Sequence, residues 1–412
     1  MGDRFLQSRP QRPCSPQPKV RVKLAQSSSN IDSSPKPVEI APNAGRRKVL
    51  LIGPGPGTRG GIAQFNSQLA RVLRDGGTDA TILAYRRIYP SFSRAGRQGP
   101  DPSQRQEDVS SAAVLVPWLP WTWFRARRVL RSRSPQIVVV QWWHPITSLS
   151  TWYLARFAKR RLRARVVFVC HNASPHEGFP LARALTRLAL GSGDRLVALS
   201  EGVAGELRSL VPTARVSVVP HPPYSVLDAD VPVANREKWD ARVGGVGGTK
   251  IVLFFGNVRP YKGLADLIDA FPQVARASNA ILVVAGTFFE PIDSYRARVD
   301  ELGIRDSVRL FDEYIPNEDV ASLFDMSDLV VLPYRTASQS GVIPLAAMFR
   351  KPVVTTNVGG LPEALAGSGV VVPPNDPEAL GDAVVAALQT PPAPPPSGED
   401  LWSRWRDAVL SS

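Results

Sequence analysis

The residues with the clearest chemical potential are two cations that follow an apolar run. The run Ile251–Phe255 ends at a glycine, and Arg259 and Lys262 come next, before an amphipathic stretch that begins at Leu264. The run predicts a buried strand and the stretch predicts a helix. Open α/β sheets bind ligands at the carboxyl ends of such strands, where Arg and Lys suit a diphosphate. Taken alone, the motif is also explained by two solvated loop cations.

Two glycine-containing loops occupy similar places. Gly60 and Gly61 follow the predicted strand Lys48–Ile52 and lead into a predicted helix, and glycine lets the backbone approach a ligand closely. In the second half, a loop after the run 329–332 opens another predicted helix, whose free N–H groups suit a phosphate. Its residues are Ser338, Gln339, Ser340, Gly341 and Val342. Each loop alone is also explained by an ordinary turn or by helix packing.

A further candidate is a histidine directly after a predicted strand. His171 follows the apolar run Val166–Cys170, and His176 and Glu177 belong to the same loop. A lone histidine is usually structural, but one at the carboxyl end of a parallel strand can reach a ligand in a cleft. Metal binding by these three side chains is not expected, because the spacing of helical or hairpin metal ligands is missing.

The pattern of apolar runs predicts an α/β protein. Runs typical of buried strands alternate with helical segments in the first half, and the alternation resumes after residue 249. Such alternation favours parallel sheets with right-handed crossovers. The expected strands are 48–52, 136–140, 166–170, 195–199, 216–219, 251–255, 281–285, 308–311, 329–332, 352–356 and 370–372.

Composition divides the chain into five segments. Residues 1–46 are rich in Pro, Ser and Gln and predict a disordered tail. A first domain covers 47–222, and the glycine-rich stretch 223–249 has the composition of a linker. A second domain covers 250–390, before a proline-rich segment and a short helix in 391–412. We therefore expect two doubly wound domains that face each other across a cleft.

The chain resembles the retaining glycosyltransferases of family 4, which have the GT-B fold of two facing Rossmann-like domains. The strongest part is Ser338–Glu363, which reads S-Q-S-G-V-I-P-L-A-A-M-F-R-K-P-V-V-T-T-N-V-G-G-L-P-E. The glycine before the helix, the K-P-V-V strand and the V-G-G-L-P-E turn fall at the family's spacing, and so long an ordered pattern is specific. The resemblance covers roughly residues 47–390.

The resemblance implies roles for the candidate residues. Arg259 and Lys262 would neutralise the diphosphate of a nucleoside diphosphate sugar, and His171 would position the sugar near the reacting centre. The other donor-binding residues would be Gly60, Gly61, Asn257, Ser338, Gln339, Ser340, Gly341 and Val342. His176 and Glu177 would lie on the acceptor side. The nucleotide sugar is a co-substrate, and neither a cofactor nor a metal is expected, because two cations already supply the positive charge.

The sequence departs from the family pattern at three positions. Many members carry a pair of glutamates around the glycine-helix, one for the donor sugar and one for the ribose, where this chain has Ser338 and Ala346. A serine can still hydrogen-bond a sugar, but an alanine cannot accept a hydrogen bond from a ribose. Asn257 stands where the usual arginine follows the strand glycine. The chain is therefore identified as a variant member that lacks the usual glutamates.

Charge and aromatic residues point to a membrane surface. Residues 1–222 carry 34 Lys and Arg against 12 Asp and Glu, whereas the rest of the chain carries 16 against 24. The aromatic run Val114–Phe124, which five arginines follow, and the segment Trp152–Arg165 have the composition of interfacial segments. We expect the first domain to rest on an anionic membrane, beside a lipid-linked acceptor. The alternative is that the aromatics pack in the core and the arginines are solvated.

Other functional classes receive less support. The first residues are polar and no apolar run is long enough to span a bilayer, which predicts a cytoplasmic protein, peripheral at the inner face of the cell membrane. Cys14 and Cys170 lie far apart, so neither a disulfide nor a zinc site is expected. The basic residues form no recognised nucleic-acid motif, so no nucleic-acid partner is expected.

The expected activity is metal-independent transfer of a sugar from a nucleoside diphosphate sugar to a hydroxyl acceptor, with retention of configuration. Cell-surface polysaccharide or glycolipid assembly is the expected setting. Because the paired glutamates are missing, a nucleotide-sugar-binding partner protein without turnover is the alternative.

Overall fold

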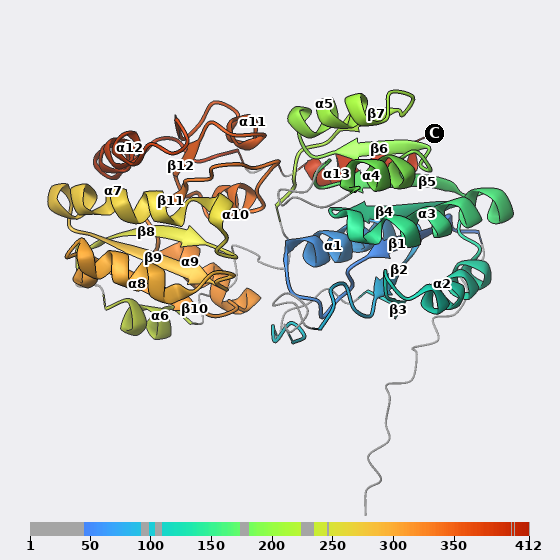
Figure 1. Cartoon of the computed structure of the whole chain (residues 1–412), viewed down its shortest axis with the longest axis horizontal. Coiled ribbons are helices and arrows are strands. Elements are labelled where there is room, and N and C mark those ends of the chain that lie inside the picture. The colour runs from blue at the N-terminus through green and yellow to red at the C-terminus, as the bar shows by residue number, and fades with distance from the viewer. Residues whose placement is uncertain are drawn as a thin grey trace, which may run out of the picture. The chain divides into compact units, whose positions relative to one another are not determined.

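The structure is a computed structural model in which residues 45–91, 99–103, 109–173, 181–223, 235–244, 247–396, 398 and 400–411 are described. The tail predicted for residues 1–46 lies almost wholly outside these ranges. Residues Asn43–Ser412 form one compact unit, which contains two parallel sheets (Figure 1). None of the helices in the described ranges has both the length and the apolar character needed to cross a bilayer.

The first sheet has seven strands in the order β3-β2-β1-β4-β5-β6-β7, and all its neighbouring strands are parallel. Along the chain, alternate strand residues belong to two apolar clusters, one on each face of the sheet. The strands are β1 (Lys48–Gly53), β2 (Asp79–Tyr85), β3 (Ser111–Leu115), β4 (Ile137–Trp142), β5 (Arg165–Cys170), β6 (Arg195–Ala198) and β7 (Val216–Val218).

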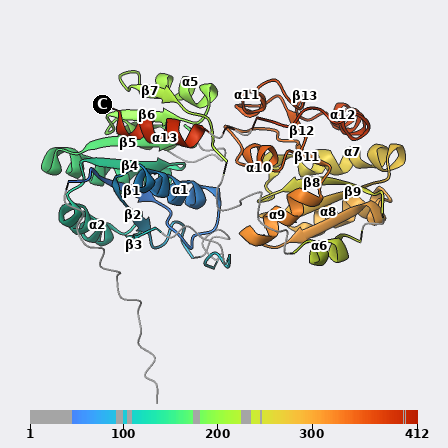
Figure 2. The same cartoon turned by 180° about the vertical axis from the view of Figure 1, so that it is seen from behind.

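Helices cover both faces of the first sheet. Helices α1 (Gly61–Asp75) and α13 (Leu401–Leu410) pack on one face, which Figure 2 shows from the front. The other face carries α2 (Pro120–Arg133), α3 (Ser148–Phe157), α4 (Ala182–Leu190) and α5 (Glu201–Leu210).

The second sheet has six parallel strands in the order β10-β9-β8-β11-β12-β13. Its strands are β8 (Lys250–Phe255), β9 (Ala280–Gly286), β10 (Val308–Asp312), β11 (Leu329–Leu332), β12 (Val353–Thr356) and β13 (Val370–Val372). Helices α7 (Leu264–Ala277), α8 (Ile292–Glu301) and α12 (Pro377–Gln389) cover one face. Helices α6 (Arg236–Val243), α9 (Asn317–Met326) and α10 (Val342–Met348) cover the other, and α11 (Leu361–Leu365) follows β12. The expectation of two doubly wound parallel sheets is confirmed.

Several elements were not predicted from the sequence. Strands β2 and β3 extend the first sheet, and α2 begins inside the run Val114–Phe124 that had been interpreted as one interfacial segment. Leu115 and Val116, at the start of that run, are instead buried in the core. The stretch 223–249 is not only a linker, because it contains α6, whose Trp239 is fully buried against Phe311.

The chain end returns to the first sheet, where arginines hold it. Arg47, Arg165 and Arg195 donate hydrogen bonds to backbone carbonyls at the carboxyl end of α13. These carbonyls lack partners within the helix and carry the negative end of its dipole, so cations stabilise them. Part of the basic excess of the first half therefore serves internal structure rather than a partner.

The turn after β12 is built on a glycine that supports the loop at 337–341. Gly359 has φ +51°, and a Cβ atom there would lie 1.7 Å from the Ala337 carbonyl oxygen. The next residue, Gly360, donates its backbone N–H to the Ser338 carbonyl oxygen at 3.1 Å. The V-G-G-L-P-E turn thus packs directly against the loop at 337–341 and holds it in place.

Gly359→Ala should destabilise the fold more than a matched glycine change. Gly367 also has positive φ (+85°), but a Cβ there meets nothing within 4 Å. Gly367→Ala should therefore cost only the left-handed strain, about 1–2 kcal/mol. Gly359→Ala should cost about 1–3 kcal/mol more, because the methyl group displaces the loop at Ala337. Urea unfolding of both variants measures this difference, and equal destabilisation would show that the turn does not support the loop.

Candidate functional site

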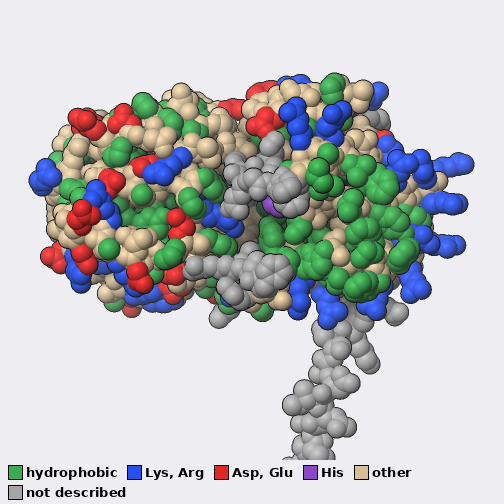
Figure 3. Space-filling view, in the orientation of Figure 1, with side chains coloured by type: hydrophobic (Ala, Val, Ile, Leu, Met, Phe, Trp, Pro, Cys, Tyr) green, Lys and Arg blue, Asp and Glu red, His purple; other side chains and the backbone are tan. Residues whose placement is uncertain are grey.

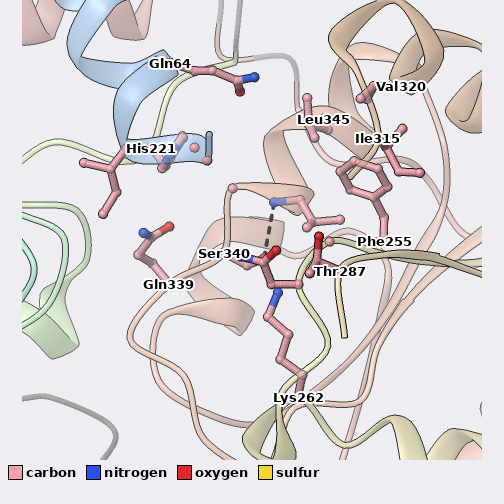
Figure 4. A pocket seen from close by; sticks show the side chains of 18 of the residues that line it. Gln64, His221, Phe255, Lys262, Thr287, Ile315, Val320, Gln339, Ser340 and Leu345 are labelled. Carbon is pink, nitrogen blue, oxygen red and sulfur yellow. Dashed lines mark hydrogen bonds between the residues drawn. The ribbon is translucent and has the colours of Figure 1, made fainter. Parts of the chain in front are cut away.

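A pocket of about 350 Å³ opens at the carboxyl ends of strands from both sheets. Figure 4 shows Gln64 and His221 on one side of it, Lys262, Thr287 and Ser340 on another, and apolar side chains on a third. In the described part of the chain, no Asp or Glu lines the pocket, whereas Lys262 does. The charge of the pocket wall therefore favours an anionic ligand.

Lys262 lies at the end of a short helical turn after β8. The glycine that follows the strand, Gly256, has φ +104°, and a Cβ there would contact the Lys262 Nζ at 3.4 Å. The ammonium group lies 5.2 Å from the centre of the Tyr334 ring. Loss of solvation lowers the pKa of Lys262 below its usual value, and nearby Arg259 lowers it further while Tyr261 raises it. A poorly solvated ammonium group gains strongly from an incoming anion.

Arg259, predicted to act with Lys262, takes a different position. It is not among the residues that line the pocket, and its guanidinium group stacks on the Phe289 ring at 4.1 Å. Its charge still influences Lys262, as the lowered pKa of that lysine shows. Of the two predicted cations, Lys262 therefore lines the pocket and Arg259 does not.

The loop after β11 supplies polar groups. Ser340 is buried, and its Oγ accepts a hydrogen bond from the Val342 backbone N–H at 3.2 Å. One of the helix N–H groups expected to hold a phosphate is thus already used. The Gln339 Oε1 atom is buried and has no hydrogen-bond partner among the residues that the structure describes. An oxygen left without a donor in a pocket wall suits a ligand hydroxyl group.

The predicted loop residues fall into two groups. Gln339, Ser340, Gly341 and Val342 line the pocket, as does the exposed Asn257. Ser338 does not, and its backbone carbonyl oxygen accepts hydrogen bonds from Gly360 and from the Ser200 hydroxyl. Ala346, at the place of the second family glutamate, is fully buried and is also outside the lining. The nearby wall is apolar and consists of Phe255, Ile315, Val320 and Leu345.

The first domain contributes the opposite wall. Gly60 has φ +111°, which favours glycine, and Gly61 opens α1. His171 follows β5 and lines the pocket although it is 5% exposed. Burial lowers the pKa of His171 to about 3, with a smaller effect from His221. The side chain is therefore neutral at physiological pH.

His221, which was not predicted, is a second histidine of this wall. It follows β7, and its Nδ1 atom lies 2.8 Å from the Pro222 carbonyl oxygen. A carbonyl only accepts, so Nδ1 carries the proton and Nε2 is an acceptor. Burial lowers the pKa of His221 to about 4. His221 lies three residues after the end of β7, so a search for a histidine shortly after a strand, rather than directly after one, would have found it.

Other lining residues absent from the prediction also follow strands. Gln64 lies in the first turn of α1, Thr287 follows β9, and Tyr314 and Asn317 follow β10. The Gln64 side chain donates a hydrogen bond to Asn317, and Tyr314 donates one to Asp101 at 2.9 Å. These contacts join loops of the two sheets beside the pocket. The sequence signal was their position after strand ends, since none belongs to a recognisable motif.

Two predicted residues, His176 and Glu177, lie outside the described residues. Within the described ranges, no three His, Cys, Asp or Glu side chains come together as a group that could hold a metal ion.

Comparisons with known proteins agree with this architecture. Residues 60–222 match the glycosyl transferase 4-like domain, and residues 249–390 match the glycosyl transferases group 1 family. The D-inositol 3-phosphate glycosyltransferase of Gordonia bronchialis is 32% identical over 243 residues, which cover 53% of this chain and 52% of that protein. The similarity thus spans about half the length of this curated relative.

Solved structures show the same fold. Sucrose-phosphate synthase from Thermosynechococcus elongatus superposes with a TM-score of 0.65 and 18% identity, over 88% of this chain and 94% of that one. HepE from Anabaena, solved with UDP and glucose, gives a TM-score of 0.62 and 17% identity, over 88% and 96%. The two matched domains and the paired parallel sheets show that this chain belongs to the family 4-type glycosyltransferases and has the GT-B fold.

Proposed function

We propose that the protein transfers a sugar from a nucleoside diphosphate sugar to a hydroxyl acceptor, with retention of configuration. The observation that carries this proposal is the poorly solvated Lys262 in a pocket without a carboxylate among its described lining residues. A diphosphate bound there would gain most when negative charge builds up on it as the sugar leaves. HepE, which shares the fold, binds UDP and glucose, and this supports the class of donor.

The pocket offers neutral groups to the sugar and the nucleoside. Hydroxyl groups can donate to Gln339 Oε1 and to the unprotonated nitrogens of the two histidines. The apolar wall at Phe255, Ile315 and Leu345 suits the flat face of a base. The diphosphate charge is met by Lys262 and, at longer range, by Arg259. The proposed transfer needs no metal, because these cations stabilise the leaving group.

We propose that the acceptor is presented at an anionic membrane surface, in cell-surface polysaccharide or glycolipid assembly. Trp121 and Phe124 on α2 are 59% and 55% exposed, and the five arginines between 125 and 133 are exposed beside them. Figure 3 shows hydrophobic side chains gathered over the first domain, with Lys and Arg side chains projecting at its edge. Exposed aromatics next to cations suit an interface between lipid and water.

The segment Trp152–Arg165 offers fewer free cations to a membrane than its composition indicates. Lys159 pairs with Asp194 at 2.7 Å, and Arg165 holds α13. Arg156 stacks on Trp152. Exposed cations remain at Arg160, Arg161 and Arg163. The proposed membrane surface is therefore centred on α2, and residues 160–163, which follow α3, extend it.

A panel of nucleotide sugars, offered with and without extracted lipid acceptors, tests the proposed activity. Release of nucleoside diphosphate together with a product of retained anomeric configuration is the expected result. Thermal stabilisation by a donor without any transfer would instead support the binding-partner alternative. Neither stabilisation nor transfer with any donor would overturn the proposal.

Lys262→Ala should lower kcat/KM strongly while leaving the fold intact. The lost cation would stabilise a developing charge, so the expected cost is about 2–4 kcal/mol of transition-state stabilisation. Lys351→Ala is the matched control, because Lys351 is also a partly buried lysine of the second domain but donates to the Asp325 carbonyl oxygen outside the pocket. Steady-state kinetics measures both, and wild-type turnover in Lys262→Ala would show that the diphosphate binds elsewhere.

His171→Ala should reduce transfer but leave the affinity for the bare nucleoside diphosphate nearly unchanged, because the side chain faces the sugar in this proposal. His144→Ala is the control, since His144 is not among the residues that line the pocket and its side chain accepts a hydrogen bond from the Ile146 backbone N–H. Kinetics and calorimetric titration separate the two effects. An equal loss of nucleotide affinity would assign His171 a structural role instead.

Membrane binding should depend on α2. Replacing Arg125, Arg128 and Arg131 with Gln should lower the affinity for anionic vesicles by on the order of a hundredfold, because each lost cation contributes about 1 kcal/mol. The double change Trp121→Ser and Phe124→Ser should weaken binding at high salt as well, whereas Val371→Ser, at an exposed apolar residue of β13, should not. Sedimentation with vesicles of different charge and salt checks this, and binding indifferent to both would contradict it.

A further inference from the structure

A chain of buried side-chain hydrogen bonds leads from the first glycine loop to His171. The Asn66 Nδ2 group on α1 donates to the Pro54 carbonyl oxygen at 2.8 Å. The Gln141 Nε2 group on β4 donates to Asn66 Oδ1 at 3.0 Å, and Gln141 Oε1 lies 2.9 Å from His171 Nε2. Asn66 and Gln141 are fully buried. Three elements that are distant in sequence thus meet in one polar chain.

The direction of every bond in this chain follows from its first member. The Pro54 carbonyl oxygen can only accept a hydrogen bond, so the Asn66 NH₂ group must point toward it. The Asn66 Oδ1 atom must then face Gln141. Gln141 then has to present its amide group to Asn66 and its oxygen to His171. An oxygen facing His171 Nε2 requires a proton on that nitrogen. A reversed amide anywhere in the chain would place two acceptors or two donors together.

The backbone makes room for this chain at Gly53. A Cβ atom there would lie 2.7 Å from Gln141 Cγ and 2.9 Å from Asn66 Nδ2. Gly53 is the last residue of β1 and does not have positive φ. The absence of a side chain at this position is therefore explained by the space that the two amides occupy, and not by a turn.

We propose that Asn66 and Gln141 are positioning residues that hold His171 as its neutral Nε2–H tautomer, so that Nδ1 is the hydrogen-bond acceptor offered to a ligand hydroxyl group in the pocket. Because Nε2 is engaged by Gln141, Nδ1 is the ring nitrogen left for a ligand. The effect on catalysis rests on the proposed sugar transfer. The tautomer itself does not.

The surroundings of His171 leave it neutral. Phe65 packs edge-on against its ring at 5.1 Å, and His221 is the nearby titratable group that affects it. The other titratable side chains that line the pocket in the described ranges are one lysine and three tyrosines, Lys262, Tyr261, Tyr314 and Tyr334. None supplies the negative charge that would favour an imidazolium at His171. We therefore expect no loss of activity from protonation of His171 between about pH 5 and pH 8.

Nitrogen-15 NMR of histidine-labelled, full-length protein tests the tautomer directly. The chain has 4 histidines, and the spectrum of His171→Gln identifies the signals of His171. At neutral pH we expect a protonated Nε2 and an unprotonated Nδ1. A protonated Nδ1, an imidazolium or a mixture of tautomers in the wild-type protein would overturn the proposal without the use of any variant in the chain.

Variants of the chain test its effect on function. Gln141→Met keeps the bulk of the side chain but removes both hydrogen bonds, and should give mixed tautomers and a kcat lowered by about tenfold to a hundredfold, as for other orienting partners of histidine. Gln141→Glu should raise the pKa of His171 by about 1–3 units, because a carboxylate favours the charged ring. Its activity should then fall as the pH decreases through the raised pKa, giving an acid limb that the wild type lacks.

Val139→Ala is the matched control. Val139 lies on the same face of β4 as Gln141 and is fully buried, so the substitution loosens the core without touching the polar chain. It should lower the melting temperature but keep the tautomer and the pH profile. If Val139→Ala shifts the pH profile as Gln141→Glu does, or if Gln141→Met leaves the tautomer unchanged, the proposal fails. The expected tautomer in a protein that transfers no sugar would instead refute only the proposed function.

Discussion

The parallel direction of the strands is the constraint on which the site depends. Every described residue that lines the pocket lies at the carboxyl end of a strand or on the loop or helix start that follows one. The strand order reverses between β1 and β4 and between β8 and β11, where neighbouring connections leave on opposite sides. Residues as distant in sequence as Gly60, His171, Lys262 and Gln339 therefore converge, although no local motif joins them.

The sequence was sufficient to predict the elements whose apolar residues form wide stripes. Strands β4, β5 and β8 are nearly continuous apolar runs, as strands buried on both faces must be. Helix α2 was missed because only Thr122, Ala126 and Leu130 are buried, a stripe one residue wide that tryptophans and arginines obscure. Helix α6 has the same difficulty, since only Trp239 and Val243 are buried. A narrow stripe gives too little periodicity to distinguish a helix from a loop.

A residue of the candidate site could be predicted where its own place in the sequence, after a strand or within a family motif, indicated it. Lys262, Gly60, Gly61 and Gln339 were found because each follows a strand or belongs to a family motif. Asn66 and Gln141 could not be found in this way, because the proposed role of each depends on its contact with the other. They are 75 residues apart, and Gln141 is 30 residues from His171. Arg259 follows the same strand as Lys262, but its guanidinium group stacks on the Phe289 ring and it is not among the residues that line the pocket, a difference that sequence position alone does not predict.

The hydrogen-bond acceptors that the described pocket lining offers to ligand hydroxyl groups are neutral rather than charged. A glutamate at position 338, where many family members have one, would add a charged acceptor to the loop after β11. With Ser338 and Ala346 at the two glutamate positions, the described pocket lining instead offers ligand hydroxyl groups neutral oxygen and imidazole acceptors. Neutral acceptors bind a hydroxyl group less strongly than a carboxylate does, so their geometry has to be better fixed.

The buried amide chain behind His171 supplies such fixation, and Phe65 extends it, because the same ring that packs on His171 also packs on Trp405 of α13. Phe65 thus lies between His171 and the helix whose carboxyl end is bound by the arginines of the first sheet.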